Sequence, residues 1–176
     1  MIFEPLDLDG VFLIKPELNE DERGFFARSF CKEEFKAHGL VNEFVQCNIS
    51  YNRKKGTLRG MHYQLPPHEE TKLVRCTKGA IYDVIVDIRK DSPTEGKWLG
   101  MEINEYDRHI IYIPNGFAHG FLTLVDETEI FYQMSASYNE KAVSGFHWND
   151  SVVNINWPTE DVIISVNDQN LPNLEI

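Results

Sequence analysis

The sequence predicts an all-β protein, a double-sheet jelly roll with one short helix. Many short runs of apolar, β-branched and aromatic residues are separated by Gly, Pro, Asn and Asp, the pattern of strands joined by turns. Only one segment is convincingly helical. Polar residues recur on strands that otherwise have the composition of buried ones, so we expect them to line a cavity between the two sheets.

Ten segments are predicted to be strands because each is short and bounded by turn residues. They cover residues 12–14, 23–30, 44–51, 56–64, 73–77, 80–88, 98–104, 109–113, 117–124 and 129–138. In residues 23–30 the aromatic side chains alternate with Arg28, so one face is apolar and the other charged. Residues 44–51 carry many amides and hydroxyls, and Lys78-Gly79 is the turn of a tight hairpin.

The other segments are a helix, loops and an irregular end. Residues 32–38 form the predicted helix, with Gly39 placed to end it, and residues 16–22 form an acidic loop before it. The last quarter, from Trp148, consists of short turns and strands and closes on the polar cluster at residues 165–168. The chain shows no repeat or linker, so residues 1–176 are predicted to form a single domain.

The strand at residues 56–64 has an unusual composition for a buried segment. Strict alternation places Leu58, Gly60, His62 and Gln64 on one face and Arg59, Met61 and Tyr63 on the other. A histidine and a glutamine beside a glycine suit a polar pocket better than an apolar core. A structural, hydrogen-bonded histidine is the alternative interpretation of His62.

Charge and composition limit the function further. The chain has 17 Lys plus Arg against 28 Asp plus Glu, a formal net charge of −11, which argues against nucleic acid as a partner. An anionic substrate must therefore be held by locally placed cations. The candidates are Arg23, Arg28, Arg59, Lys72, His62 and His119.

The cysteines and the hydropathy indicate a soluble, cytoplasmic protein. Cys31, Cys47 and Cys76 are an odd number without metal-type spacing, as expected in a reducing compartment. No apolar run is long enough to span a membrane, and the first residues lack the basic region of a signal peptide.

A series of motifs resembles the dTDP-4-dehydrorhamnose 3,5-epimerase family. The motifs are residues 21–26 (DERGFF), 58–64 (LRGMHYQ), 72–75 (KLVR), 83–94 (DVIVDIRKDSPT), 113–121 (IPNGFAHGF), 148–150 (WND), 157–158 (WP) and 165–168 (SVND). They occur in order and with the family's spacing from about Gly10 to Asp168. The resemblance implies a cupin-type double-stranded β-helix, a homodimer, no cofactor and no metal. It also implies epimerisation of a nucleotide-linked 4-keto-6-deoxy sugar at C3 and C5.

The resemblance assigns four catalytic residues, and their chemistry suits this reaction. His62 is the expected base that removes a proton next to the ketone, and Asp168 orients its imidazole and steadies the imidazolium. Tyr132 is the expected proton donor on the opposite face of the sugar ring. Lys72 is expected to stabilise the oxyanion that develops at O4.

The resemblance also implies a set of substrate-binding residues. They are Arg23, Arg28, Gln46, Asn48, Arg59, His119 and Tyr138. The cations are expected to bind the pyrophosphate, and Tyr138 to stack on thymine. The alternatives are surface ion pairs for Arg23 and Arg59, core packing for Tyr132 and Tyr138, and a turn or cap role for Asp168.

Four positions depart from the family pattern. Arg28 stands where a nucleotide-binding glutamate is usual, Val143 and Cys47 replace commonly acidic residues, and Asn167 replaces a lysine. None of them is one of the expected catalytic residues. They leave the nucleotide open, with dTDP expected and CDP or GDP as the alternatives.

A metal-dependent cupin and a sugar-binding module are the alternative classes of protein. Pro114, Gly116 and His119 resemble the second half of the metal motif of metal-dependent cupins, but His62-Tyr63-Gln64 lacks the paired histidines of the first half. A metal set improvised from His62, His119 and Glu69 has poor spacing. A non-catalytic sugar-binding module would not need a histidine, a tyrosine and an aspartate together.

Overall fold

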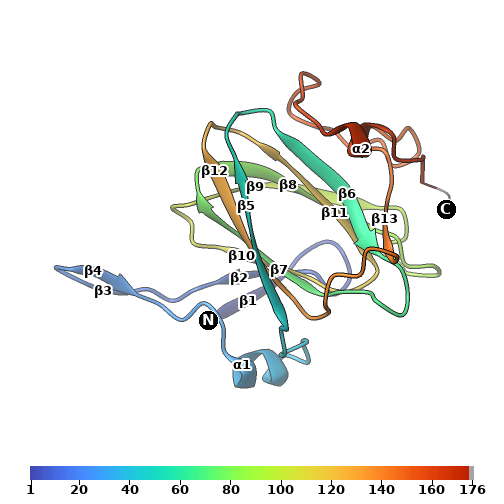
Figure 1. Cartoon of the computed structure of the whole chain (residues 1–176). Helices are drawn as coiled ribbons and strands as arrows, with labels where there is room; N and C mark the ends of the chain where they lie inside the picture. Colours follow the sequence, from blue (N-terminus) through green and yellow to red (C-terminus); the bar gives the residue numbers. More distant parts are fainter. Residues whose placement is uncertain (175–176) are drawn as a thin grey trace.

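The computed structural model describes residues 1–174 and consists of two antiparallel sheets and a small separate hairpin (Figure 1). The six-stranded sheet has the order β1 (Ile2–Pro5), β2 (Phe12–Lys15), β10 (Ile110–Ile113), β7 (Lys72–Lys78), β12 (Thr128–Met134) and β5 (Gln46–Asn52). The five-stranded sheet has the order β13 (Val143–Gly145), β6 (Leu58–Gln64), β11 (Phe117–Thr123), β8 (Ala80–Asp87) and β9 (Trp98–Asn104). Strands distant in sequence are neighbours in both sheets, which confirms the predicted jelly roll.

The alternation of apolar residues along each strand separates three cores. In β8, Ile81 and Ile85 point between the sheets, where they join Phe121 of β11 and Val74 of β7 in the central core. Val84, on the opposite face of β8, packs in a second core under the C-terminal segment. The outer face of the six-stranded sheet carries a third core, which is built around the phenylalanine of the helix α1 (Lys32–Ala37).

A bulge in β6 overturns the strict alternation predicted for this strand. His62 pairs with His119 and Arg59 with Phe121, so β6 advances three residues while β11 advances two. Arg59 therefore lies on the same side as His62, and both line one cavity. The bulge requires Gly60, which has a φ of 135° and whose added Cβ would lie 2.6 Å from the Cα of Gly120.

The segment before α1 also differs from its prediction. The expected loop at 16–22 and strand at 23–30 are instead a hairpin of β3 (Asn19–Asp21) and β4 (Gly24–Phe26). This hairpin projects away from the two sheets (Figure 1). A turn at residues 22–23 was missed because its residues are charged and the aromatics that follow suggested one continuous strand. Arg28 lies beyond β4 and is not part of any strand.

Two shorter differences concern the second half of the chain. β12 ends at Met134, so Tyr138 lies in the following loop and not on the same strand as Tyr132. The polar cluster at 165–168 opens a single helical turn, α2 (Val166–Gln169), which is too short to show helical periodicity. Its N-cap is Ser165, whose hydroxyl accepts a hydrogen bond from the backbone N–H of Asp168 at 3.1 Å.

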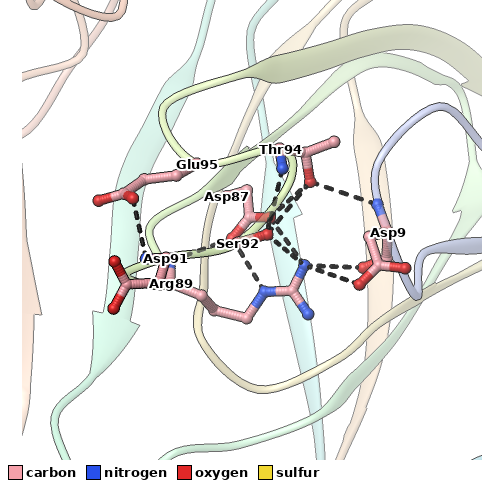
Figure 2. Close-up of polar contacts among 7 residues, drawn as sticks. All are labelled: Asp9, Asp87, Arg89, Asp91, Ser92, Thr94 and Glu95. Carbon is pink, nitrogen blue, oxygen red and sulfur yellow. Dashed lines mark hydrogen bonds and ion pairs between the residues drawn. The ribbon is translucent and has the colours of Figure 1, made fainter.

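One buried aspartate fastens the loop between β8 and β9. Asp87 is fully buried and accepts hydrogen bonds from Arg89, Ser92 and Thr94, and Arg89 reaches on to Asp9 (Figure 2). Burial opposes ionisation of the carboxyl group, but these hydrogen bonds outweigh burial and lower its pKa to about 2. The aspartate-to-threonine motif at residues 87–94 thus has a structural role in loop closure.

Candidate active site

His62 is held by Asp168, which comes from a distant part of the chain. His62 Nε2 lies 2.8 Å from Asp168 Oδ1, so β6 and α2 together form the pair. The second carboxylate oxygen accepts from the backbone N–H of Gly60 at 3.4 Å. Burial opposes ionisation of Asp168, but the hydrogen bonds from His62 and Gly60 outweigh it, and its pKa lies below the ordinary value. The carboxylate fixes the proton on Nε2 and leaves Nδ1 of His62 as the basic nitrogen.

A second histidine and aspartate pair lies beside the first. His119 is the cross-strand partner of His62, and its Nε2 lies 2.8 Å from Oδ2 of Asp83. Both side chains are buried, Asp83 completely. Within residues 1–174, Asp83 Oδ1 has no hydrogen-bond partner. The His119 hydrogen bond is therefore the main compensation for burying this carboxylate.

Tyr132 faces the two histidines from the opposite sheet. It lies on β12, and its ring meets the His119 ring edge-on at 6.2 Å between centroids. Burial raises the pKa of the Tyr132 phenol above its ordinary value, the charge of Asp83 adds to this effect, and Arg59 opposes it. The phenol therefore keeps its proton until a strong base, such as a carbanion, develops beside it.

Lys72 provides a positive charge on the same sheet as Tyr132. It opens β7, next to β12, and its ammonium lies 3.2 Å from Glu70 Oε1. Arg59 supplies a second cation from β6, and its Nε donates to Asn52 at 2.8 Å. Both cations line the same cavity as His62 and Tyr132.

These groups surround one cavity of about 510 Å³. A space of this size suits a small organic ligand, and its walls combine apolar side chains with a few polar groups. Among the described residues, no group of three His, Cys, Asp or Glu side chains could hold a metal ion.

Comparison with known proteins gives the family. The model of the dTDP-4-dehydrorhamnose 3,5-epimerase family matches residues 5–175. An enzyme of this name from Shigella flexneri is 44% identical over 165 residues, which are 93% of this chain and 91% of the relative. The chain belongs to the dTDP-4-dehydrorhamnose 3,5-epimerase family. This is a family of carbohydrate epimerases, as the sequence resemblance indicated.

Solved structures of the epimerase family agree with this assignment. The enzyme from Bacillus anthracis, determined with TDP and pyrophosphate bound, superposes with a TM-score of 0.95 at 41% identity, covering 98% of this chain and 99% of that one. The enzyme from Legionella pneumophila, in complex with dTDP-4-keto-L-rhamnose, has a TM-score of 0.90 at 34% identity and covers 99% of both chains. The fold is thus the cupin-like jelly roll of these epimerases.

Most residues that the sequence suggested for an epimerase site lie together. The ones that line the cavity are Asn48, Arg59, His62, Lys72, His119, Tyr132 and Tyr138. Asp168 supports His62 from behind. Gln46 is beside the cavity, where its Oε1 accepts from the backbone N–H of Tyr138 at 3.0 Å.

The two arginines of the N-terminal region do not line this cavity. Arg23 is 85% exposed on the turn of the projecting hairpin, where it pairs with Asp21 at 2.5 Å. Arg28 pairs with Glu34 of α1 at 3.1 Å. Their role in substrate binding stays a prediction, and within one chain they are placed away from the other binding residues.

Two polar residues of the site were missed at the level of sequence. Asp83 is a charged residue inside the apolar run of β8, and that contrast was a usable signal. Glu70 lines the cavity beside Lys72, but in the sequence it follows another glutamate in a loop after two prolines. Nothing in that local pattern distinguishes Glu70 from an exposed charge.

Among residues 1–174, no helix is long and apolar enough to cross a membrane.

Proposed function

We propose that this protein converts dTDP-4-dehydro-6-deoxy-D-glucose to dTDP-4-dehydro-L-rhamnose by inverting C3 and C5. The proposal rests on the arrangement of His62 and Tyr132. The base lies on β6 of one sheet and the phenol on β12 of the other, with the cavity between them. Inversion of a carbon requires a proton to leave from one face and return to the other, and opposing sheets supply such a pair.

The reaction begins with removal of the proton next to the C4 ketone. His62 takes this proton, and Asp168 stabilises the resulting imidazolium, from which it accepts a hydrogen bond. The negative charge that develops on O4 is stabilised by the Lys72 ammonium. Tyr132 then returns a proton to the opposite face of the carbon. The phenolate is reprotonated from solvent and the His62 imidazolium releases its proton to solvent, which restores both groups.

The remaining cavity residues suit a nucleoside diphosphate. Arg59 can contact phosphate oxygens. His119 lines the cavity from the neighbouring strand, with its Nε2 already bound to Asp83. Tyr138 is exposed at the rim, where a base can stack on its ring, and Asn48 offers an amide nearby. In this proposal the whole chain forms one catalytic domain, which works in the cytoplasm with its three cysteines reduced.

The active form is proposed to be a homodimer. β5 is an edge strand of the six-stranded sheet, and Ile49 and Tyr51 on it are exposed. The projecting hairpin adds Phe26, which is 76% exposed. Large apolar side chains exposed at an edge strand and on a projecting hairpin suit contact with another chain. Arg23 and Arg28 do not line the cavity of their own chain. In a homodimer they could reach the cavity of the partner protomer and bind substrate there.

The proposal is tested by incubating the protein with dTDP-4-keto-6-deoxyglucose in deuterium oxide. Proton removal and return from solvent should place deuterium at both C3 and C5, which mass spectrometry and NMR of the sugar will locate. Deuterium at one carbon alone would restrict the activity to a single inversion. Absence of deuterium from both carbons, with the nucleotide sugar bound, would contradict the proposed function.

A further inference from the structure

Glu70 is a nearly buried carboxylate in the cavity wall, between two donors. Its Oε1 lies 3.2 Å from the Lys72 ammonium, and its Oε2 accepts from the amide nitrogen of Gln64 at 3.0 Å. The side chains of Glu70 and Lys72 are only 10% and 11% exposed. This pair is therefore much better shielded from water than the surface ion pairs whose contribution is usually negligible.

The surroundings of Glu70 fix the Gln64 amide toward it. Gln64 Oε1 accepts from the backbone N–H of Asn139 at 2.7 Å, which determines the orientation of the amide. The amide nitrogen is therefore directed at Glu70 and at the backbone oxygen of His68, 2.9 Å away. A carboxylate can accept from Gln64 and Lys72 at once, whereas a glutamine has only one acceptor atom.

We propose that Glu70 is a positioning residue that acts through Lys72. It holds the ammonium at the cavity wall, where the oxyanion of the reaction develops. A lysine ammonium on its flexible stem is otherwise attracted to the strongest anion within reach, and the two phosphates of the substrate are such an anion. This inference rests on the proposed function, since both the oxyanion and the phosphates belong to that substrate.

This role predicts opposite effects on catalysis and on binding. The oxyanion exists only near the transition state, so a misplaced Lys72 lowers kcat and leaves the affinity for the ground state intact. Removing the charge of Glu70 also removes a repulsion toward the phosphates. A purely structural role would instead lower the amount of folded protein and leave kcat of the folded fraction unchanged.

The first test is Glu70→Gln, which has nearly the same shape. We expect kcat to fall about 10- to 100-fold, with KM unchanged or lower and with dTDP bound at least as tightly in calorimetry. Glu69→Gln is the matched control, because it removes the same charge one residue away and outside the cavity lining. Unchanged kcat in Glu70→Gln, or a rise in KM with kcat intact, would overturn the proposal.

The second test asks whether Glu70 acts through Lys72. In a double-mutant cycle with Lys72→Met, Glu70→Gln should cause no further loss of deuterium incorporation. If the two losses multiply, Glu70 acts on the substrate itself and the proposal is wrong. Should Glu70→Gln fail to fold, Glu70→Asp keeps the charge but shortens the reach, and should lower kcat with KM unchanged. Turnover by the unmodified protein tests the proposed function separately.

Discussion

His119 lies directly opposite His62 on the neighbouring strand, and each imidazole is held by its own aspartate. The two pairs differ in their access to the cavity. The side chain of His62 is 40% exposed, whereas that of His119 is 5% exposed and its aspartate is completely buried. The accessible pair suits proton exchange with a ligand, whereas the buried pair directs its Nε2 at Asp83. The bulge in β6 places Arg59 on the same side as both histidines.

The first prediction concerns the proposed base. In His62→Ala the base is absent, and in Asp168→Asn the imidazole loses the carboxylate that sets its tautomer and stabilises its charged form. We expect each variant to lose on the order of 10²- to 10⁴-fold in deuterium incorporation at both carbons. Circular dichroism and dTDP binding should remain close to those of the unmodified protein. Rapid incorporation in His62→Ala would show that another residue is the base.

The second prediction separates the acid from the base. In Tyr132→Phe the proton on the far face is missing, but His62 can still remove and return a proton on its own side. Exchange of deuterium into the substrate should therefore persist while net inversion falls. The comparison is made in one reaction, by mass spectrometry for exchange and by NMR for the configuration. Equal loss of exchange and inversion would remove Tyr132 as the opposite-face acid.

Some features of this protein follow from local sequence patterns, and others depend on tertiary packing. The strands were predictable because alternation and turn residues are local signals. His62, Lys72 and Tyr132 were identified by the resemblance, and their residue types suit acid–base chemistry. The resemblance also led us to expect that Asp168 orients His62, and the two side chains are in contact in the structure. Local patterns alone could not give this contact, because the residues are 106 positions apart and it depends on how the C-terminal segment packs on β6.

The errors have equally physical causes. Strict alternation failed in β6 because a bulge adds one residue to one strand of a pair, which a single strand does not reveal. The β3–β4 hairpin was read as a loop and a strand because its turn residues are charged and carry no Pro or Asn. Glu70 was missed because its importance comes from burial between Gln64 and Lys72, and burial is a tertiary property.

The third prediction concerns stability and pH. The pKa of Asp87 is lowered from 3.8 to about 2 in the folded protein. Its ionised form therefore stabilises the fold above about pH 4, and this stabilisation is lost as the pH falls through 2. Asp87→Asn should lower the free energy of unfolding at pH 7 by about 2 kcal/mol. The difference in this free energy between the variant and the unmodified protein should shrink as the pH falls below about 4.

Urea unfolding at a series of pH values measures this effect. Asp91→Asn is the matched control, since it removes a carboxylate from the same loop but not from the buried network (Figure 2). It should change stability little at any pH. A difference between Asp87→Asn and the unmodified protein that does not vary with pH would show that the ionised state of Asp87 is not what stabilises the loop.

The fourth prediction tests the homodimer. Phe26 is exposed on the hairpin, so Phe26→Ser should not disturb the fold of one protomer, but it should weaken a dimer that buries this ring. Light scattering should show a dimer for the unmodified protein and a concentration-dependent loss of dimer, with loss of activity, for the variant. Val152→Ser is the control, because Val152 is also exposed but lies in the C-terminal segment. A fully active monomer would contradict the proposed partner.

The last prediction is about the nucleotide. Thymine presents an N3–H donor between two carbonyl acceptors, and Arg28, which has only donors, cannot accept from N3. In this structure Arg28 pairs with Glu34 outside the cavity, so within one chain the base is left with Tyr138 and the nearby amide of Asn48. We expect stacking on Tyr138 to dominate. Tyr138→Ala should weaken dTDP about 5- to 100-fold, and Tyr138→Phe should bind almost normally.

Calorimetric titration with dTDP, UDP, CDP and GDP measures the preference directly. We expect dTDP to bind best, because its methyl group adds apolar contact to the stacked ring. Stacking alone discriminates weakly, so the margin over UDP should be small. Arg28→Glu restores the glutamate that is usual at this position in the family. If residue 28 reaches the cavity of the partner protomer in a dimer, the glutamate can accept from thymine N3–H and should strengthen dTDP binding. A clear preference for CDP or GDP would overturn the thymidine assignment and leave the epimerisation mechanism intact.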